Sequence, residues 1–334
     1  MRYGLQLMKA PTSLALLGVL VLGCGSDAQQ TVATESPSAV DAGSRHRDAG
    51  SVTSTVDHSS ASPRDAGPQI VPSEASGGGD SSDDDCGDAA KLVYVLDESG
   101  QLSSFRPDAL AFVDIGRLTC DPASKPYSMS VDRQGVAWVV YESGQLYHVS
   151  TSDASCTPIA SPIGAGGFSK FGMGFVALEG NPDDDKLFIA GPRTADISLD
   201  LVSALGVIDP ASLSITRVGS LDGVSPELSG TGDGKLWAFY AQDTPPRLNR
   251  LDPKTSATLE SHTLQSIGGG GATAWAMAFW GGDFWLFLRT SGATSTTVYQ
   301  VDGKTFEQHA VIPNSGRGIV GAGVSTCAPL QVLL

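Results

Sequence analysis

The chain has 334 residues, which fits two domains or one large all-β domain, and its formal net charge is −15, from 21 Lys and Arg against 36 Asp and Glu. Because phosphate binding needs clustered positive charge, this balance argues against nucleic acid as a partner. Gly contributes 40 residues and Pro 19, while only 17% of residues are charged, which favours many tight turns over amphipathic helices.

The chain begins with the pattern of a secretory signal peptide. Arg2 and Lys9 precede an apolar run from Leu14 to Leu22. That run is too short to remain in a bilayer as a permanent span. An exported protein is therefore predicted.

The end of this run resembles the lipobox of bacterial lipoproteins. It reads Val21-Leu22-Gly23-Cys24, with Val21 where Leu is commoner. In that family the peptide is cut before the Cys, which carries the lipid, so the resemblance implies removal of residues 1–23 and membrane attachment through Cys24. Gly25 stands where the inner-membrane retention signal would have Asp, which favours the outer membrane. The alternative is an ordinary secretory signal with a chance Cys.

Residues 24–87 have the composition of a disordered linker. Ser, Ala, Asp, Gly, Thr and Pro dominate it, and no Phe, Trp or Tyr occurs between Tyr3 and Tyr94. A segment with so little to bury cannot offset its conformational entropy. As a flexible coil it would reach roughly 45 Å and hold a domain away from a membrane. The acidic run from Asp80 to Asp85 lacks the spaced ligands of a calcium loop, so solvated charge is the preferred interpretation.

Residues 88–334 contain five copies of one β unit. In each copy, two apolar residues three positions apart lead into a turn. The pairs are Leu102 and Phe105, Leu146 and Val149, Leu205 and Ile208, Leu248 and Leu251, and Val298 and Val301. They recur at intervals of 43 to 59 residues, and the longest interval carries an insertion around 193–203. Each pair follows a dense apolar strand and precedes a weaker one, and four of the five units begin with a further strand.

Four short strands per unit are typical of β-propeller blades. The first unit lacks its leading strand, and the final segment, Gly318–Ser325, is a leading strand with nothing after it. Pairing the two would close the ring and remove both open edges. We therefore expect an all-β fold, a five-bladed propeller closed by the C-terminal strand.

Two resemblances accompany this pattern. The turn after each apolar pair resembles that of YVTN-type and quinoprotein-like repeats. Residues 88–334 are also similar to uncharacterised lipoproteins of myxobacteria, in strings such as Pro226–Gly234, Trp280–Trp285 and Gly321–Cys327. Neither resemblance implies a function.

The leading strands alternate small and large residues, as in Ser128-Met129-Ser130-Val131 and Ala276-Met277-Ala278-Phe279. Because alternate residues lie on opposite faces, bulky faces would fill the bare faces of neighbouring blades and leave a narrow axis. In the fourth unit the register assigned as bulky reads Glu227, Ser229 and Thr231. The other units place Tyr127, Phe171 and Trp275 there.

These residues form the predicted binding site. A mouth ringed by Tyr127, Phe171 and Trp275, with one carboxylate at Glu227, would hold a sugar or a cationic small molecule, because local rules tend to fail at functional sites. The alternative is that Glu227 points into water at a strand end. The aromatic-rich stretch 275–287 suits a blade core better than a ligand platform.

With Cys24 lipidated, four Cys remain, and an even number in an exported domain implies disulfides with three possible connectivities. We expect Cys86–Cys327 to lock the ring seam and Cys120–Cys156 to join adjacent blades. No close Cys or His pair occurs, so no metal site and no cofactor are predicted. No nucleophile elbow occurs either.

Two functions compete at this stage. The first is a lipid-anchored cell-envelope module that binds or scaffolds a protein or glycan, with an accessory role in envelope assembly as a variant of it. The second is a propeller enzyme, such as a lactonase-like hydrolase or a glycan lyase. Converging carboxylates at the starts of the inner strands would favour the enzyme, and the sequence offers mainly Glu227 there.

Overall fold

The computed structural model describes residues 86–160, 167–181, 184–192, 203–268 and 271–332. The predicted signal peptide, Cys24 and nearly all of the predicted linker lie outside the described residues, as does the insertion apart from its last residue. Within the described ranges, no helix is long and apolar enough to cross a membrane. Two short 3-10 helices occur there, η1 (Asp88–Lys91) and η2 (Leu178–Gly180).

Twenty strands form five antiparallel sheets of four strands each, which are the blades of a β-propeller. Blade 1 contains, from inside to outside, β20 (Ile319–Gly323), β1 (Val93–Asp97), β2 (Gln101–Arg106) and β3 (Ala111–Arg117). Blade 2 contains β4 (Pro126–Val131), β5 (Val136–Tyr141), β6 (Leu146–Ser150) and β7 (Cys156–Pro158). Blade 3 contains β8 (Gly172–Ala177), β9 (Asp185–Gly191), β10 (Ala204–Ile208) and β11 (Ile215–Ser220). Blade 4 contains β12 (Glu227–Gly230), β13 (Leu236–Tyr240), β14 (Arg247–Leu251) and β15 (Thr258–Thr263), and blade 5 contains β16 (Ala272–Trp280), β17 (Asp283–Thr290), β18 (Thr297–Asp302) and β19 (Gln308–Ile312).

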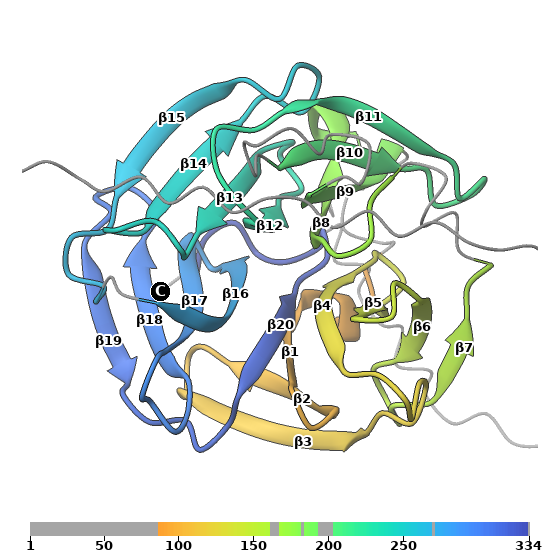
Figure 1. Ribbon diagram of the computed structural model, residues 1–334, viewed down its shortest axis with the longest axis horizontal. Helices are drawn as coiled ribbons and strands as arrows, with labels where there is room; N and C mark the ends of the chain where they lie inside the picture. Colours follow the sequence, from red (N-terminus) through yellow and green to blue (C-terminus); the bar gives the residue numbers. More distant parts are fainter. Residues whose placement is uncertain (1–85, 161–166, 182–183, 193–202, 269–270, 333–334) are drawn as a thin grey trace, which may run out of the picture. The chain divides into compact units, whose positions relative to one another are not determined.

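The ring closes as the sequence predicts. Figure 1 shows the blades around a common axis, with β20, β4, β8, β12 and β16 innermost. The last strand, β20, pairs antiparallel with the first, β1, and places Gly323 opposite Tyr94 and Gly321 opposite Leu96. β1 is therefore paired on both sides, and the unpaired side of β20 faces the axis, as it does for the inner strands of the other blades.

The repeated pair of apolar residues explains why the blades stack. Residues three apart on a strand point to opposite faces of its sheet. In blade 1, Leu102 packs into the core shared with blade 2, while Phe105 packs into the core shared with blade 5. In blade 4, Leu248 and Leu251 likewise belong to the two cores on either side of their sheet. Each blade is thus buried on both faces, and five inter-blade cores result.

The Asp that follows three of these pairs stabilises the turn after it. Asp209 Oδ1 accepts hydrogen bonds from the backbone N–H groups of Ala211 and Ser212. Asp252 and Asp302 do the same for the two residues that follow at the equivalent positions. These hydrogen bonds favour the carboxylate and hold the pKa of Asp209 at about 2. These three carboxylates therefore have a structural role, because they stabilise the turns that follow them.

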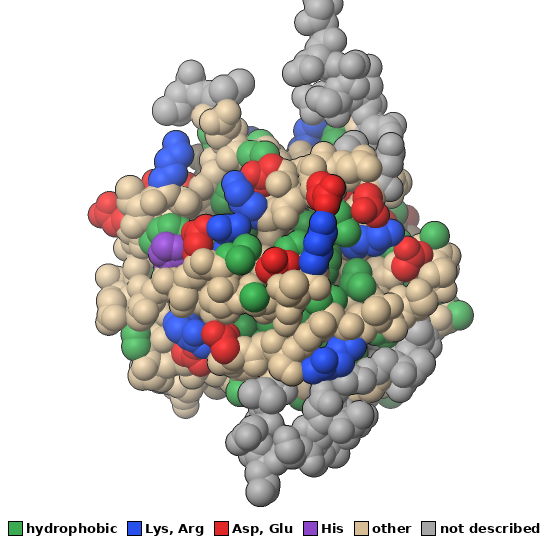
Figure 2. Space-filling view, turned by 90° about the horizontal axis from the view of Figure 1, so that it is seen from above, with side chains coloured by type: hydrophobic (Ala, Val, Ile, Leu, Met, Phe, Trp, Pro, Cys, Tyr) green, Lys and Arg blue, Asp and Glu red, His purple; other side chains and the backbone are tan. Residues whose placement is uncertain are grey.

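Both predicted disulfides are present, Cys86–Cys327 at the ring seam and Cys120–Cys156 between blades 1 and 2. Disulfides persist in oxidising compartments, so this pair fits an exported protein. On the outside of the ring, Figure 2 shows acidic and basic side chains interspersed among polar and apolar ones. Exposed ion pairs of this kind, such as Lys254 with Glu179, add little stability because both partners remain solvated.

Candidate functional site

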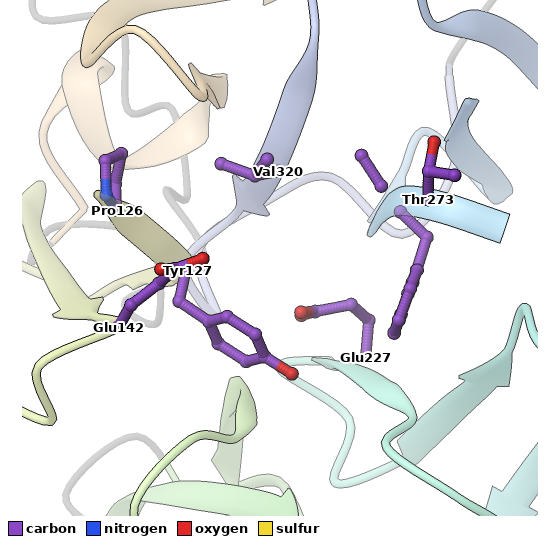
Figure 3. A pocket seen from close by; sticks show the side chains of 8 residues that line it. Pro126, Tyr127, Glu142, Glu227, Thr273 and Val320 are labelled. Atoms are coloured by element: carbon purple, nitrogen blue, oxygen red, sulfur yellow. The ribbon is translucent and has the colours of Figure 1, made fainter. Parts of the chain in front are cut away.

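A cavity of about 120 Å³ lies at one end of the propeller axis. Its lining comes from the inner strands of blades 1, 2, 4 and 5 and from the turn after β5, and comprises Pro126, Tyr127, Glu142, Glu227, Thr273, Ala274, Trp275 and Val320. Three of the four residues predicted to bind a ligand therefore meet here. Figure 3 shows the Glu227 side chain and the Tyr127 ring converging on the same space.

Glu227 is buried, with 3% of its surface exposed, so the alternative that it points into water is wrong. Its side chain extends from β12 in blade 4 towards blade 2, where the Ser128 hydroxyl donates a hydrogen bond to Oε2 at 3.0 Å. The backbone N–H of Met173 in blade 3 also donates to this carboxyl. Glu227 therefore connects three blades.

Gly172 makes the room that this side chain needs. A Cβ at position 172 would lie 3.1 Å from the Glu227 Cδ and 2.3 Å from the backbone oxygen of Pro226. The second distance is far inside van der Waals contact, and the obstructing atom belongs to the backbone. Close approach of β8 and β12 therefore depends on glycine at this position.

Burial raises the pKa of Glu227 well above its ordinary value. The hydrogen bonds from Ser128 and from the backbone N–H groups of Met173 and Leu228 oppose that shift. Among the described residues, no Lys or Arg forms an ion pair with Glu227. The group is thus a buried carboxyl at a cavity wall with no compensating positive charge.

The structure corrects the register that the sequence suggested for blade 4. Glu227 lies opposite Phe239 and Ser229 opposite Trp237, so these side chains point to the face that meets blade 5. Leu228 packs instead into the core shared with blade 3. Glu227 therefore occupies the small-residue register, and its assignment to the bulky one was wrong. Strict alternation identifies two faces of a strand but does not say which neighbour each face meets.

Equivalent hydrogen bonds confirm the corrected register. In blade 4, Ser229 Oγ accepts from the Phe279 N–H of blade 5 at 3.0 Å. In blade 2, Ser130 Oγ accepts from the Phe175 N–H of blade 3 at 3.2 Å. Ser229 thus matches Ser130, and one step earlier Glu227 matches Ser128. A carboxylate replaces a hydroxyl at this position.

Tyr127 and Trp275 approach the cavity from opposite sides and share one partner. The Tyr127 hydroxyl bonds to the Ser225 side chain, and Trp275 Nε1 donates to the Ser225 backbone oxygen at 3.2 Å. Both rings thereby keep their polar atoms engaged with protein. Burial, together with the nearby charges of Glu227 and Glu142, raises the pKa of Tyr127 to about 12. The surfaces left for a ligand are aromatic.

A β-bulge places Tyr127 at the cavity. The pairing of β4 with β5 shifts between Pro126 and Ser128, so Tyr127 leaves the face that carries Met129. Its ring packs against the core shared with blade 3, whereas Met129 packs into the core shared with blade 1. Sequence alternation alone would have placed the two residues on one face.

Phe171 does not line the cavity, which corrects the predicted site. Its side chain is 1% exposed and packs into the core between blades 2 and 3, with its ring centroid 6.4 Å from that of Phe168. It precedes β8, whose first residue, Gly172, adjoins Glu227. Phe171 therefore supports the wall without reaching the ligand space.

The sequence did not identify Glu142. This exposed residue follows β5 and lines the cavity rim. Because β5 runs antiparallel to β4, the end of β5 lies beside the start of β4, and this pairing was the signal that could have revealed Glu142. On another side of the mouth, Lys170 Nζ lies 5.6 Å from the centre of the Tyr127 ring. No group of metal-binding side chains occurs among the residues that the structure describes.

The opposite end of the axis is closed by the segment after β20. Thr326 Oγ1 donates to Asp185 Oδ2 of blade 3 at 2.7 Å and accepts from Arg133 Nη1 of blade 2 at 3.2 Å. The Ser325 hydroxyl donates to the backbone oxygen of Ala90 at 2.6 Å. Cys327 then forms the disulfide with Cys86. This end is occupied by the chain itself.

A second cavity, of about 430 Å³, lies between blades 3 and 4 and includes Lys186, Asp209 and Pro253 in its lining. Its lysine already pairs with Asp209 at 3.0 Å and with Asp184 at 3.2 Å. The charges there satisfy one another, whereas the Glu227 carboxyl at the axial cavity has no cationic partner among the described residues. The axial cavity is therefore the better candidate for a functional site.

Comparisons with known proteins bear on the fold alone. No family model matches the chain, and no curated protein matches it. Among solved structures, TolB from Acinetobacter baumannii is 16% identical, with a TM-score of 0.42 over 68% of this chain and 54% of that one, so the chain spans about half of its length. A chain of a nidogen/laminin complex is 10% identical, with a TM-score of 0.45 over 72% of this chain and 99% of that one. A protein of unknown function from Bacteroides caccae is also 10% identical, with a TM-score of 0.41 over 70% of this chain and 97% of that one. Likeness at this level carries no argument about function, and the β-propeller assignment rests on the sheets themselves.

Proposed function

We propose that this protein is a lipid-anchored binding or scaffold module of the cell envelope, which binds a protein or glycan partner through its axial cavity. The observation that carries the proposal is the meeting of Tyr127, Trp275 and Glu227 at one open end of the axis. Aromatic surfaces with a few convergent polar groups are typical of ligand sites. The cavity holds one small group of the partner, since about 120 Å³ is less than the volume of a drug-sized site.

The position at which the chain enters the propeller also supports a binding site at the axial cavity. Val320, near the start of β20, lines the cavity, whereas Cys327 follows the end of β20 and is bonded to Cys86. The first described residue of the propeller therefore lies at the end of the axis away from the cavity. A partner can therefore reach the cavity without passing the point at which the chain enters the propeller.

Two tryptophans at opposite ends of β16 provide a matched test. Trp275 lines the cavity, whereas Trp280 donates a hydrogen bond to the Lys91 backbone oxygen at 2.8 Å near the seam. The full-length protein and its Trp275→Leu and Trp280→Leu variants should be compared in capture of envelope proteins and glycans. We expect Trp275→Leu to lose the captured partner and Trp280→Leu to retain it. Equal capture by both variants would contradict the proposal, and comparable far-ultraviolet circular dichroism of the variants would show that each remains folded.

Membrane attachment has its own test. Cys24→Ser removes the residue that would carry the lipid, and we expect the variant to move from the membrane fraction to the soluble fraction. Retention of the variant in membranes would contradict a lipid anchor at Cys24, while leaving the cavity's role intact.

A second function rests on one observation, the placement of two carboxyl groups, Glu142 and Glu227, at the same cavity. A buried carboxyl with a raised pKa beside an exposed one is the pattern used by glycoside-cleaving enzymes. This alternative predicts turnover of a glycan or lactone by the wild type and loss of turnover in Glu227→Gln. A binding module shows no turnover in either protein.

A further inference from the structure

We infer that the axial cavity recognises an organic ammonium group, with Glu227 as its counter-ion and Tyr127 and Trp275 as its aromatic walls. This inference rests on the proposed function and narrows it to one chemical class of ligand. The ammonium belongs either to an alkylamine, as at the end of a lysine side chain, or to an amino sugar. Both present the same positive charge to the cavity.

The aromatic walls favour a cation over a neutral hydroxyl-rich group. The Trp275 indole N–H is used by the Ser225 backbone oxygen and the Tyr127 hydroxyl is hydrogen-bonded to the Ser225 side chain, so beyond that hydroxyl the walls offer a sugar no further polar atom. What remains is ring surface, which attracts ammonium groups through its quadrupole. A neutral sugar would find few directional partners on these walls.

The carboxyl groups supply the charge that an ammonium requires. Glu227 forms the inner wall and Glu142 lies at the rim, and both raise the pKa of Tyr127 through their negative charge, which places both near the Tyr127 hydroxyl. Lys170 is the cation on the Tyr127 side of the mouth, 5.6 Å from the ring centre, and it is only partly buried. Arg289, which contacts Thr273 of the lining, is already paired with Glu98. Ionisation of Glu227 therefore supplies the negative charge that balances a bound ammonium.

The size of the cavity limits the ligand to a small cationic group. A cavity of 150 Å³ accommodates benzene in another protein, so about 120 Å³ suits an ammonium with a few carbon atoms. A larger ligand would insert only such a group and leave the rest of its structure outside the mouth.

Binding of a cation should release a proton. The empty cavity favours the protonated form of Glu227 because the carboxyl is buried without a counter-ion, and an ammonium beside it favours the carboxylate. The groups that face Glu227 are the Tyr127 hydroxyl and the Ser128 hydroxyl on β4 and the Met173 N–H on β8, with Glu142 and Lys170 at the rim. A neutral ligand would leave the Glu227 proton in place, so proton release distinguishes the two ligand classes.

The test is calorimetric titration of the full chain with charged and neutral partners of matched shape. The probes are n-butylammonium against n-butanol, and glucosamine against glucose. We expect the charged member of at least one pair to bind and its neutral partner to bind at least about 10-fold more weakly. The pair that binds identifies whether the ammonium is of the alkylamine or the amino-sugar kind. Titration in two buffers of different ionisation enthalpy should show release of up to about one proton per bound cation.

Three variants of the cavity and one control variant test this result further. Glu227→Gln should weaken cation binding at least about 30-fold and abolish proton release, because it removes the buried charge of the pair. If Glu227→Gln does not fold, Trp275→Leu should weaken binding about 10-fold and the exposed substitution Glu142→Gln about twofold. Ser229→Ala is the matched control, because it removes another buried polar group of β12 that lies outside the cavity lining, and it should bind as the wild type does.

Equal binding of neutral and charged probes, or cation binding without proton release, would overturn the inference. So would the failure of both charged probes to bind while Trp275→Leu still abolishes capture of the natural partner, and in that case the proposed function would stand. Equal capture of the partner by Trp275→Leu and Trp280→Leu would instead overturn the proposed function itself.

Discussion

The two ends of the propeller axis are built from the same inner strands and end in opposite ways. At the sealed end, Thr326 joins Asp185 and Arg133, and the disulfide between Cys86 and Cys327 holds the closing segment in place. At the open end, Tyr127, Glu227 and Trp275 line the axial cavity. The contacts that close the ring are therefore concentrated at one end of the axis, and the other end remains available for a ligand.

The largest expected effect comes from breaking the sealed end. Removing Cys86 and Cys327 together should lower the free energy of unfolding by about 5 kcal/mol, and removing Cys120 and Cys156 by about 4 kcal/mol, because the first pair closes the longer loop. The sequence separations are 241 and 36 residues. Urea unfolding of the two double Cys→Ala variants measures the difference. A greater loss from the Cys120 and Cys156 pair would show that the seam is not the stabilising element.

The seam and both disulfide pairings could be predicted from the sequence, whereas the details of the open end could not. The apolar pairs such as Leu248 and Leu251 define the third strand of each blade, and the unpaired leading strand at Gly318–Ser325 identifies the closure. These features recur, so each copy supports the others. Glu227 was misassigned because β12 is short and Leu228 is its only bulky residue, so the pattern there has no second member to fix its register.

Tyr127 and Phe171 show a second reason why the sequence could not predict the site in full. Both were expected at the mouth, but only Tyr127 lines the cavity. A bulge after Pro126 turns Tyr127 towards the axis, and bulges have no reliable signature in a single sequence. The cavity rim at Glu142 depends on strand pairing, which the sequence shows only once the blade order is known.

The next largest effect is expected at the open end. Gly172→Ala would place a Cβ 2.3 Å from the Pro226 backbone oxygen and should lower the free energy of unfolding by about 3 kcal/mol. Gly87→Ala, at the sealed end, is the control, because nothing lies within 4 Å of a Cβ there and its φ of −59° suits any residue. Thermal unfolding of the two variants measures the contrast. Similar unfolding temperatures for both would show that β8 and β12 are not in close contact.

A smaller effect is expected from the hydrogen bonds of the sealed end. Thr326→Val removes the hydroxyl that joins Asp185 and Arg133, and should lower the free energy of unfolding by about 2 kcal/mol, because the half-buried carboxyl of Asp185 loses a donor. The cavity lies at the other end of the axis, so ligand binding by this variant should match that of the wild type. A change in ligand affinity without a change in stability would contradict the separation of the two ends.

The smallest effect is a pH dependence that originates at Glu227. Its folded pKa lies above the ordinary 4.5 because of burial, so as pH rises past 4.5 the unfolded chain ionises first and the folded state loses relative stability until its own pKa is passed. Each unit of the shift corresponds to about 1.4 kcal/mol. Carboxyls with lowered pKa values, such as Asp209 at about 2, are already ionised in both states in this range. Stability relative to Glu227→Gln should therefore fall as pH rises above 4.5, and a parallel pH profile for the two proteins would contradict this assignment.

The most direct measurement of a ligand site at the open end uses the indole N–H signals of the five Trp residues. Only Trp275 lines the cavity, and the Trp275→Leu variant identifies its signal in a nuclear magnetic resonance spectrum. During titration with n-butylammonium, we predict that the Trp275 signal shifts and that those of Trp138, Trp237 and Trp285, which are buried in the blade cores, stay in place. A Trp275 signal that does not move, or one that moves no more than those of the core tryptophans, would contradict ligand binding at the axial cavity.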